Sequence, residues 1–332
     1  MSEANAEQVV AALSSAGRVL LATHTHPDGD AIGSITALRL ALAHRGTPVE
    51  VFVSHQDAVL PDELATFDLG TVVHEETVDL GGDRVVVFLD CGNADRSPLG
   101  DRLGEMRTVV NVDHHHDNTA FGTINHLVPD ASSTAEVVWD LIHRLDVPLD
   151  ASIAEALYVG LVTDTGRFSY ENTTPRAHQM AAELLATGID VTAIRRRLYE
   201  DVRPAKLHLL RYALDSFEIH GDGTLISARI SAEDFAAAGA TEAHAEGIID
   251  VIRTLRGVRI AALARELEHT PGTFKVSLRA ADPTIDVSAI ARVGGGGGHP
   301  QAAGFTTERS DADLAEFLLA EVAAQDAAVG TV

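Results

Sequence analysis

Short apolar runs alternate with stretches of helical periodicity through roughly the first 190 residues of the chain. The apolar runs are rich in Val and Leu and do not alternate with polar positions, as in strands that are buried on both faces; they lie at 18–23, 85–89 and 108–112. Apolar positions with helical spacing follow at 31–40, 133–145, 153–161 and 176–186. This alternation predicts βαβ units and a mostly parallel sheet that is flanked by helices.

The pattern changes after residue 190. Two helical stretches, 192–199 and 206–211, are separated near Pro204 and predict linking helices. We therefore expect an α/β chain with a first domain over 1–190, a helical linker over 191–214 and a smaller α+β domain over 215–332.

Hairpins dominate the last third of the chain. Apolar runs at 217–220 and 224–230 flank a Gly-Asp-Gly turn, and runs at 258–267 and 273–278 flank a second turn. Helical stretches at 242–255 and 311–323 are expected to cover one face of the resulting sheet.

Acidic and histidine side chains come directly after the apolar runs of the first domain. They form four segments, His24–Asp30, Asp90–Gly92, Asp113–His116 and Thr163–Gly166. Because parallel strands end at one edge of their sheet, where ligands bind, segments that are distant in sequence are expected to meet there. The result would be a cluster of carboxylates and imidazoles, a ligand set that suits divalent ions such as manganese or magnesium.

The number of ligands is enough for two ions. His24, Asp28 and Asp30 share one strand end, Asp90 is placed to bridge, and two further ligands come from His114 and Asp164. Two ions about 3.5–4 Å apart would activate water and clamp a phosphoryl group. Taken alone, Asp28 or Asp30 is best explained as the N-cap of the helix that begins near Ala31, and only the four segments together favour a metal site.

Composition restricts the partners. The formal net charge of −24 disfavours binding to long nucleic acids and favours short anionic substrates whose charge is offset by metal ions. No apolar run approaches the ~20 residues of a membrane span, and the acidic start does not resemble a signal peptide. The single cysteine, Cys91, fits a cytoplasmic protein, and we interpret it as a small packed residue rather than a nucleophile.

Five consecutive glycines, 294–298, precede His299 and follow an expected helix at 286–292. Backbone without side chains can approach a phosphate closely, and Arg279 at a strand end offers a planar fork for the same group. A flexible surface loop is the alternative explanation for the glycines.

These motifs together resemble those of the DHH phosphoesterases. The first domain matches through His24-x-x-Pro-Asp-x-Asp30, Leu89-Asp90, Asp113-His114-His115 and Thr163-Asp164-Thr165-Gly166. The second matches the DHH-associated domain through Ser277-Leu278-Arg279 and the glycine run with His299. Within the family, the chain is most similar to the bacterial oligoribonuclease/pAp phosphatases (nanoRNases), some of which act on cyclic di-AMP or pApA.

The resemblance implies a role for each matching residue. His24, Asp28 and Asp90 would bind the first ion, and the second, usually Mn²⁺ like the first, would be bound by Asp30, Asp90, His114 and Asp164. His115 would contact the scissile phosphate in a cleft between the domains, which makes Asp90, His114 and His115 the catalytic residues. Substrate would also be bound by Arg279, Gly295, Gly296, Gly297, Gly298 and His299. The family pattern often has three or four glycines before the histidine, so the register of this loop differs.

The expected protein is a cytoplasmic phosphodiesterase and phosphatase that acts on short oligoribonucleotides, pApA or cyclic di-AMP, and 3′-phosphoadenosine 5′-phosphate. The resemblance also implies a homodimer. The alternatives are a manganese pyrophosphatase, a single-strand exonuclease and a non-catalytic nucleotide sensor. A pyrophosphatase would lack the glycine–histidine segment, an exonuclease would carry a basic groove, and a sensor would have lost metal ligands.

Overall fold

The computed structural model describes residues 2–329 and divides into two compact units, Met1–Asp201 and Val202–Val332. The division falls within the segment expected to link the domains, between helices α6 (Val191–Tyr199) and α7 (Pro204–Asp215). Among the described residues, no helix combines the length and apolar character that crossing a membrane requires.

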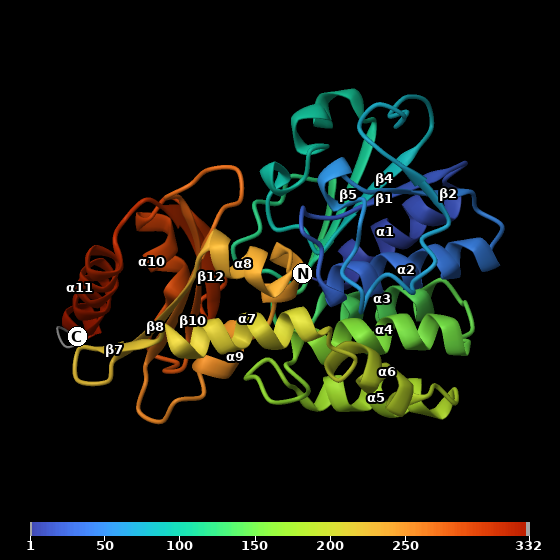
Figure 1. The fold of residues 1–332 in the computed structure, drawn as a ribbon. Helices are drawn as coiled ribbons and strands as arrows, with labels where there is room; N and C mark the ends of the chain where they lie inside the picture. Colours follow the sequence, from blue (N-terminus) through green and yellow to red (C-terminus); the bar gives the residue numbers. More distant parts are fainter. Residues whose placement is uncertain (1, 330–332) are drawn as a thin grey trace. The chain divides into compact units, whose positions relative to one another are not determined.

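The first unit contains a six-stranded sheet in the order β3-β2-β1-β4-β5-β6, and every pair of neighbours is parallel (Figure 1). The expected strands form the centre: β1 (Val19–Ala22), β4 (Val85–Leu89) and β5 (Thr108–Asp113). Three further strands, which sequence analysis missed, complete the sheet: β2 (Val49–Phe52), β3 (Thr71–Val73) and β6 (Ile124–Leu127). The prediction of a mostly parallel sheet is confirmed.

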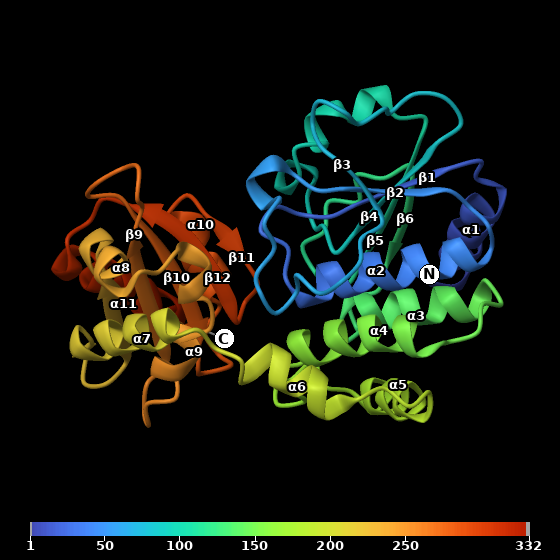
Figure 2. The same cartoon turned by 45° about the vertical axis from the view of Figure 1, so that its right-hand side comes forward.

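Helices cover one face of this sheet (Figure 2). Leu21, Val87 and Val110 face a core formed with α1 (Ser2–Ser15), which was not anticipated, and with four expected helices: α2 (Gly29–His44), α3 (Thr134–Arg144), α4 (Ala151–Asp164) and α5 (Pro175–Ala186). Leu20 and Phe88 point to the opposite face, which packs against loops and short 3₁₀ turns around Leu99 and Met106. Both faces are therefore buried, which explains the continuous apolar runs.

The second unit contains a mixed sheet in the order β11-β12-β10-β9-β8-β7. The two predicted hairpins are present: β7 (Glu218–His220) pairs antiparallel with β8 (Leu225–Ile230), and β9 (Ile260–Glu266) with β10 (Phe274–Ala280). β12 (Ala302–Thr307) and the two-residue β11 (Gly297–Gly298) extend the sheet beyond β10.

The prediction that two helices cover one face of this sheet is wrong. The stretch 242–255 is broken by Gly247, whose φ is +76°, into a 3₁₀ turn (Glu242–Ala245) and α9 (Ile248–Ile252). α9 and α7 pack on one face, whereas α10 (Val287–Val293) and α11 (Asp311–Val329) pack on the other. α8 (Ala232–Ala238) completes the unit beside α7.

Candidate metal centre

The loop after β1 presents the first ligand candidates. His24 Nδ1 lies 2.8 Å from the carbonyl oxygen of Thr25, so this nitrogen donates and Nε2 faces Asp90 Oδ2 at 3.5 Å. Asp28 is the N-cap of α2, and its Oδ1 accepts hydrogen bonds from the backbone N–H groups of Asp30 and Ala31, at 3.0 Å each. Ligand atoms of His24, Asp28 and Asp90 also lie within 4.8 Å of one another. Asp28 thus serves as the cap and belongs to the cluster.

The N-terminus of α3 holds Asp30. Its Oδ2 accepts the backbone N–H of Thr134 at 2.6 Å, and its Oδ1 accepts that of Ala135 at 2.9 Å. The Thr134 hydroxyl donates to Asp90 Oδ1 at 3.0 Å, so one residue orients two carboxylates. Sequence analysis did not identify Thr134; its only signal was its place at the start of an expected helix.

A second group forms from Asp30, His114 and Asp164, whose ligand atoms lie within 4.8 Å of one another. His114 Nε2 is 3.5 Å from Asp164 Oδ2, while its Nδ1 lies 3.2 Å from the carbonyl oxygen of Ala131. The side-chain amide of Asn172 donates to Asp164 Oδ2 at 3.3 Å. A further hydrogen bond therefore orients His114 and Asp164, as is usual for residues that bind metals.

Asp90 lies between the two groups. Its carboxylate is 3.5 Å from His24 Nε2 and 3.9 Å from His114 Nε2. Its φ of +56° is in the left-handed region, which few residues other than glycine adopt, although Asp does so more often than most. This backbone conformation directs the side chain from the end of β4 to the middle of the cluster.

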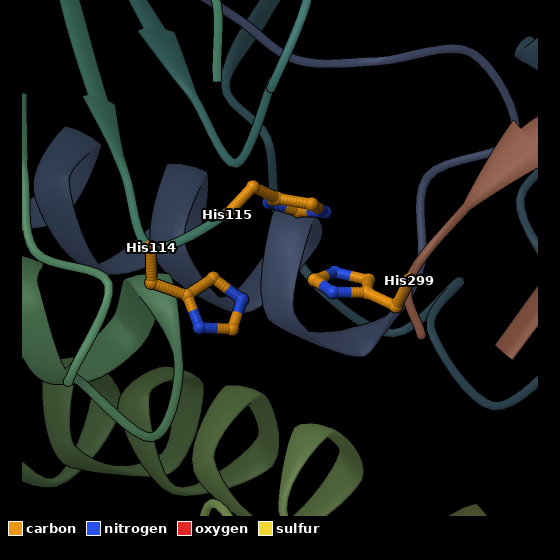
Figure 3. A group of neighbouring side chains, drawn as sticks. All are labelled: His114, His115 and His299. Carbon is orange, nitrogen blue, oxygen red and sulfur yellow. The ribbon is translucent and has the colours of Figure 1, made fainter. Parts of the chain in front are cut away.

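His115 is adjacent but has a different partner. Its Nδ1 lies 2.7 Å from Asp113 Oδ1, and the other oxygen of Asp113 accepts the side-chain amide of Asn118. The rings of His114 and His115 meet edge to face with centroids 5.1 Å apart (Figure 3). Arg96, which sequence analysis missed, ends a short 3₁₀ turn (Ala94–Arg96) and approaches His115 Nε2 to 3.5 Å through Nη1.

The electrostatics of the cluster favour a bound cation. Burial, reinforced by neighbouring carboxylates, raises the pKa values of Asp30 and Asp164 well above their usual range. Burial acts in the same direction on Asp90, but its hydrogen bond to His24 and the nearby imidazoles hold its pKa below the ordinary value. For His24 and His114, burial lowers the pKa but the carboxylates raise it overall. Divalent cations would relieve this repulsion, and the oxygen and nitrogen donors fit them.

The remaining site candidates lie in the second unit. Arg279 is on β10, where its Nη1 donates to the carbonyl oxygen of Leu278 at 3.1 Å and its Nε is 3.3 Å from Asp250 Oδ1. The glycine run continues from α10 into β11, so part of it is an edge strand and not an open loop.

The glycines of this run differ in what surrounds them. A Cβ atom would lie 2.0 Å from the Gly304 carbonyl oxygen at Gly296 and 2.6 Å from that of Ala302 at Gly298, whose φ is +140°. At Gly295 and Gly297, by contrast, a Cβ atom would meet nothing within 4 Å. A Cβ atom at Gly294 would also lie 2.6 Å from the ring of Phe305, so packing explains three of the five glycines. Gly295 and Gly297 are open and better placed to approach a ligand, although the φ of +85° at Gly295 also favours glycine there. His299 follows in a tight turn, with its backbone N–H bonded to the carbonyl oxygen of Ala302 at 2.8 Å.

Cys91 shows no sign of nucleophilic activation. It is fully buried against the loop side of the sheet, and its thiol donates to the carbonyl oxygen of Asn93 at 3.2 Å. Burial raises the pKa of the thiol to about 12, which keeps it protonated.

Comparison with known proteins supports both units. The model of the DHH family, N-terminal domain, matches residues 18–161, and that of the DHHA1 domain matches residues 222–325. A bifunctional oligoribonuclease and PAP phosphatase, NrnA, of Thermus thermophilus is 33% identical over 299 residues, which cover 90% of this chain and 87% of that protein. The NrnA protein of Bacillus subtilis is 26% identical, with 93% of this chain and 96% of that protein covered. Among solved structures, an exopolyphosphatase-related protein from Bacteroides fragilis has the same fold, with a TM-score of 0.86, 24% identity and 96% of each chain covered.

Proposed function

The chain belongs to the DHH family of phosphoesterases, and on this premise we propose that it uses two divalent ions, Mn²⁺ above others, to hydrolyse short oligoribonucleotides and dinucleotides such as pApA and to dephosphorylate 3′-phosphoadenosine 5′-phosphate. The observation that carries the proposal is the position of Asp90, which reaches the His24–Asp28 group and the His114 group at once. A carboxylate shared by two ligand groups is suited to hold two ions at the short separation of a two-metal site, about 3.5–4 Å.

Six residues would hold the ions. His24, Asp28 and Asp90 surround one position, and Asp30, Asp90, His114 and Asp164 surround the other. When bound, the ions supply a Lewis acid for the phosphoryl oxygens and lower the pKa of water. Thr134 and the N-terminus of α3 fix the two central carboxylates before an ion arrives.

The neighbouring side chains are suited to bind the scissile phosphate. His115 is aligned by Asp113, which also raises the pKa of its imidazole against the opposing effect of burial, and so favours the form that donates to an anion. Arg96 lies beside it and would provide a second positive charge. Arg279, the open glycines and His299 of the second unit are proposed to bind the remainder of the substrate.

The net charge of the chain favours short substrates. With a net charge of −24, the chain repels long polyanions, so only a few phosphates are expected to be bound, close to the metal ions and the few available cations. The names of the relatives agree with this size class, since both describe an oligoribonuclease that is also a PAP phosphatase.

A hydrolysis panel tests the proposal. Purified full-length protein would be incubated with Mn²⁺ and pApA, a short oligoribonucleotide, cyclic di-AMP, pAp or pyrophosphate, with Asp90→Asn as the inactive control. AMP released from pApA, short RNA or pAp by the wild type alone supports the proposal. Cleavage restricted to pyrophosphate, or nucleotide binding without any hydrolysis, would replace it with the pyrophosphatase or the sensor.

A further inference from the structure

Two histidines and two glutamates meet where β2 and β3 end. His55 begins a 3₁₀ turn (His55–Asp57) three residues after β2, and His74, Glu75 and Glu76 directly follow β3. Ligand atoms of His55, His74 and Glu75 lie within 4.8 Å of one another. These strands supply no residue to the candidate metal centre, so the cluster is a separate feature of the same sheet edge.

Each histidine of the cluster is held through one ring nitrogen, which leaves the other ring nitrogen to bind a metal ion. His74 Nδ1 lies 2.7 Å from the carbonyl oxygen of Val53; since a carbonyl only accepts, this nitrogen carries the proton and Nε2 keeps a lone pair. His55 Nε2 contacts Glu76 Oε2 at 2.5 Å, which leaves its Nδ1. The two rings stack with centroids 4.7 Å apart and planes at 16°. A histidine that donates one N–H to a carbonyl or a carboxylate is the usual arrangement behind a metal ligand.

The carboxylate of Glu75 is oriented in the same way. Its Oε1 accepts the hydroxyl of Ser54 at 2.8 Å, and its Oε2 accepts the backbone N–H of His55 at 3.1 Å. Although partial burial opposes it, these hydrogen bonds keep the pKa of Glu75 below its usual value, and the hydrogen bond to His55 does the same for Glu76. Both glutamates are therefore anionic over the physiological range.

We propose that His55, His74 and Glu75, with Glu76 as orienting residue or fourth ligand, form a further cation site that is selective for Zn²⁺ or a similar transition metal. Two imidazoles and one or two carboxylates match the ligands and the coordination number of zinc. Mn²⁺ and Mg²⁺ are poorer fits here, because they prefer sets dominated by carboxylates and water. The stacked rings direct their lone pairs along near-parallel planes, so coordination of one ion requires the His55 ring to rotate out of the stack. The exposure of His55 leaves room for that rotation and for a water ligand.

An ion at this position would act, through Asp57, on the loop after β1 that carries His24 and Asp28. Asp57 belongs to the same 3₁₀ turn as His55 and is buried, and its Oδ1 accepts the backbone N–H of His26 at 3.0 Å. His26 lies in the loop that carries His24 and Asp28. Zinc would thus join the loops after β2 and β3 and, through Asp57, stiffen the loop after β1.

The chain offers a matched control. His143 and Glu183 form a comparable half-exposed pair on helices, with Nε2 and Oε1 3.0 Å apart, but no third ligand group of the described residues completes it. If a single histidine–glutamate pair were enough for zinc, substitution of His143 would change binding as strongly as substitution at the proposed site.

The test measures zinc stoichiometry on full-length protein without a polyhistidine tag, after saturation with Mn²⁺. Wild type, His55→Ala/His74→Ala and His143→Ala are dialysed against micromolar Zn²⁺ and bound metal is quantified. We expect the double variant to bind one Zn²⁺ per chain less than the other two and to lose the zinc-dependent rise in melting temperature. Zinc that replaces Mn²⁺ in the candidate metal centre would be equal in all three proteins.

Mn²⁺-dependent hydrolysis by the double variant, close to that of wild type, shows that it is folded. If it does not fold, Glu75→Gln replaces it, because the amide keeps the shape of the side chain and loses its charge. Equal zinc stoichiometry in wild type and the folded variant would overturn the proposal.

Discussion

The backbone N–H of Thr134 donates to Asp30 Oδ2 at 2.6 Å, which places the first turn of α3 directly against a buried carboxylate of α2. The N-terminus of a helix stabilises negative charge, whereas burial and the nearby Asp90 and Asp164 act against it. The helix therefore positions Asp30 without fully neutralising the cluster, and a divalent ion would complete the neutralisation. This relationship makes Thr134 a positioning residue that can be tested.

Replacement of Thr134 by Val removes the hydroxyl that orients Asp90 and keeps the backbone bond to Asp30. We expect Mn²⁺ affinity to fall about 10- to 100-fold, as for other residues that orient metal ligands. Thr134→Ser retains the hydroxyl and should stay near wild type. Metal titration followed by activity measures both; equal Mn²⁺ affinity of the Val and Ser variants would show that this hydroxyl is dispensable.

Asp90→Asn should have the largest effect of any single substitution in the centre. It removes one carboxylate charge from both proposed ion positions and breaks the contact with His24. Since a Lewis-acidic ion contributes several kcal/mol to catalysis, turnover is expected to fall by about three orders of magnitude. Bound Mn²⁺ should be measured with the rate, because full activity with both ions retained would contradict the two-metal proposal.

Arg279→Ala should weaken substrate binding more than the chemical step. A charge-assisted hydrogen bond contributes about 1.5–3 kcal/mol, so a rise in KM of roughly 10- to 100-fold is expected with kcat nearly unchanged. Arg211→Ala is a suitable control, because Arg211 is exposed on α7. Its ion pair with Asp215 is long, with 3.8 Å between Nε and Oδ2. An unchanged KM would remove Arg279 from the substrate site.

The pH dependence of stability provides a test that does not involve the metal ions. His126 on β6 is buried, and burial lowers its pKa below the ordinary value of 6.5. The unfolded chain therefore takes up a proton at a higher pH than the folded chain, so this residue costs stability as the pH falls below about 6.5.

His126→Gln should abolish that contribution. From pH 7.5 to 5, the free energy of unfolding of wild type should fall relative to the variant, by at most about 1.4 kcal/mol per pH unit. Urea denaturation of both proteins at each pH measures the difference, in which all other titrations cancel. Parallel curves would mean that His126 titrates normally in the folded state.

The strong features of the fold were predictable because they are local in sequence. The runs that end at Leu89 and Val112 are mostly apolar, as is typical of strands with two buried faces, and the ends of parallel strands share a sheet edge. β2 and β3 escaped prediction because Val49–Phe52 is short and interrupted by Glu50, and Thr71–Val73 has three residues. β3 is at the edge of the sheet and β2 lies between it and β1, and such short strands are specified by their neighbours more than by their own sequence.

Periodicity can also predict a helix that is too long. The apolar spacing of 242–255 continues across Gly247, where the left-handed backbone separates a 3₁₀ turn from α9. Within the candidate centre, aspartates and histidines are informative by residue type, but Thr134, Asn118 and Arg96 are ordinary polar residues in isolation. Their roles depend on contacts with Asp90, Asp113 and His115 that periodicity does not indicate. Thr134 and Arg96 reach partners in distant segments, and Asn118 contacts Asp113 across the loop that follows β5.

The division at Asp201 has an evolutionary consequence. Every proposed metal ligand precedes it, and Arg279, the glycine run and His299 follow it, each set inside a unit with its own core. Under the proposed function, the first unit would carry the reaction chemistry and the second most of the contacts that select the substrate. A lineage could retune specificity by mutation of the second module while the first remains under constant selection, and paralogues with new substrates would then differ mainly after residue 201.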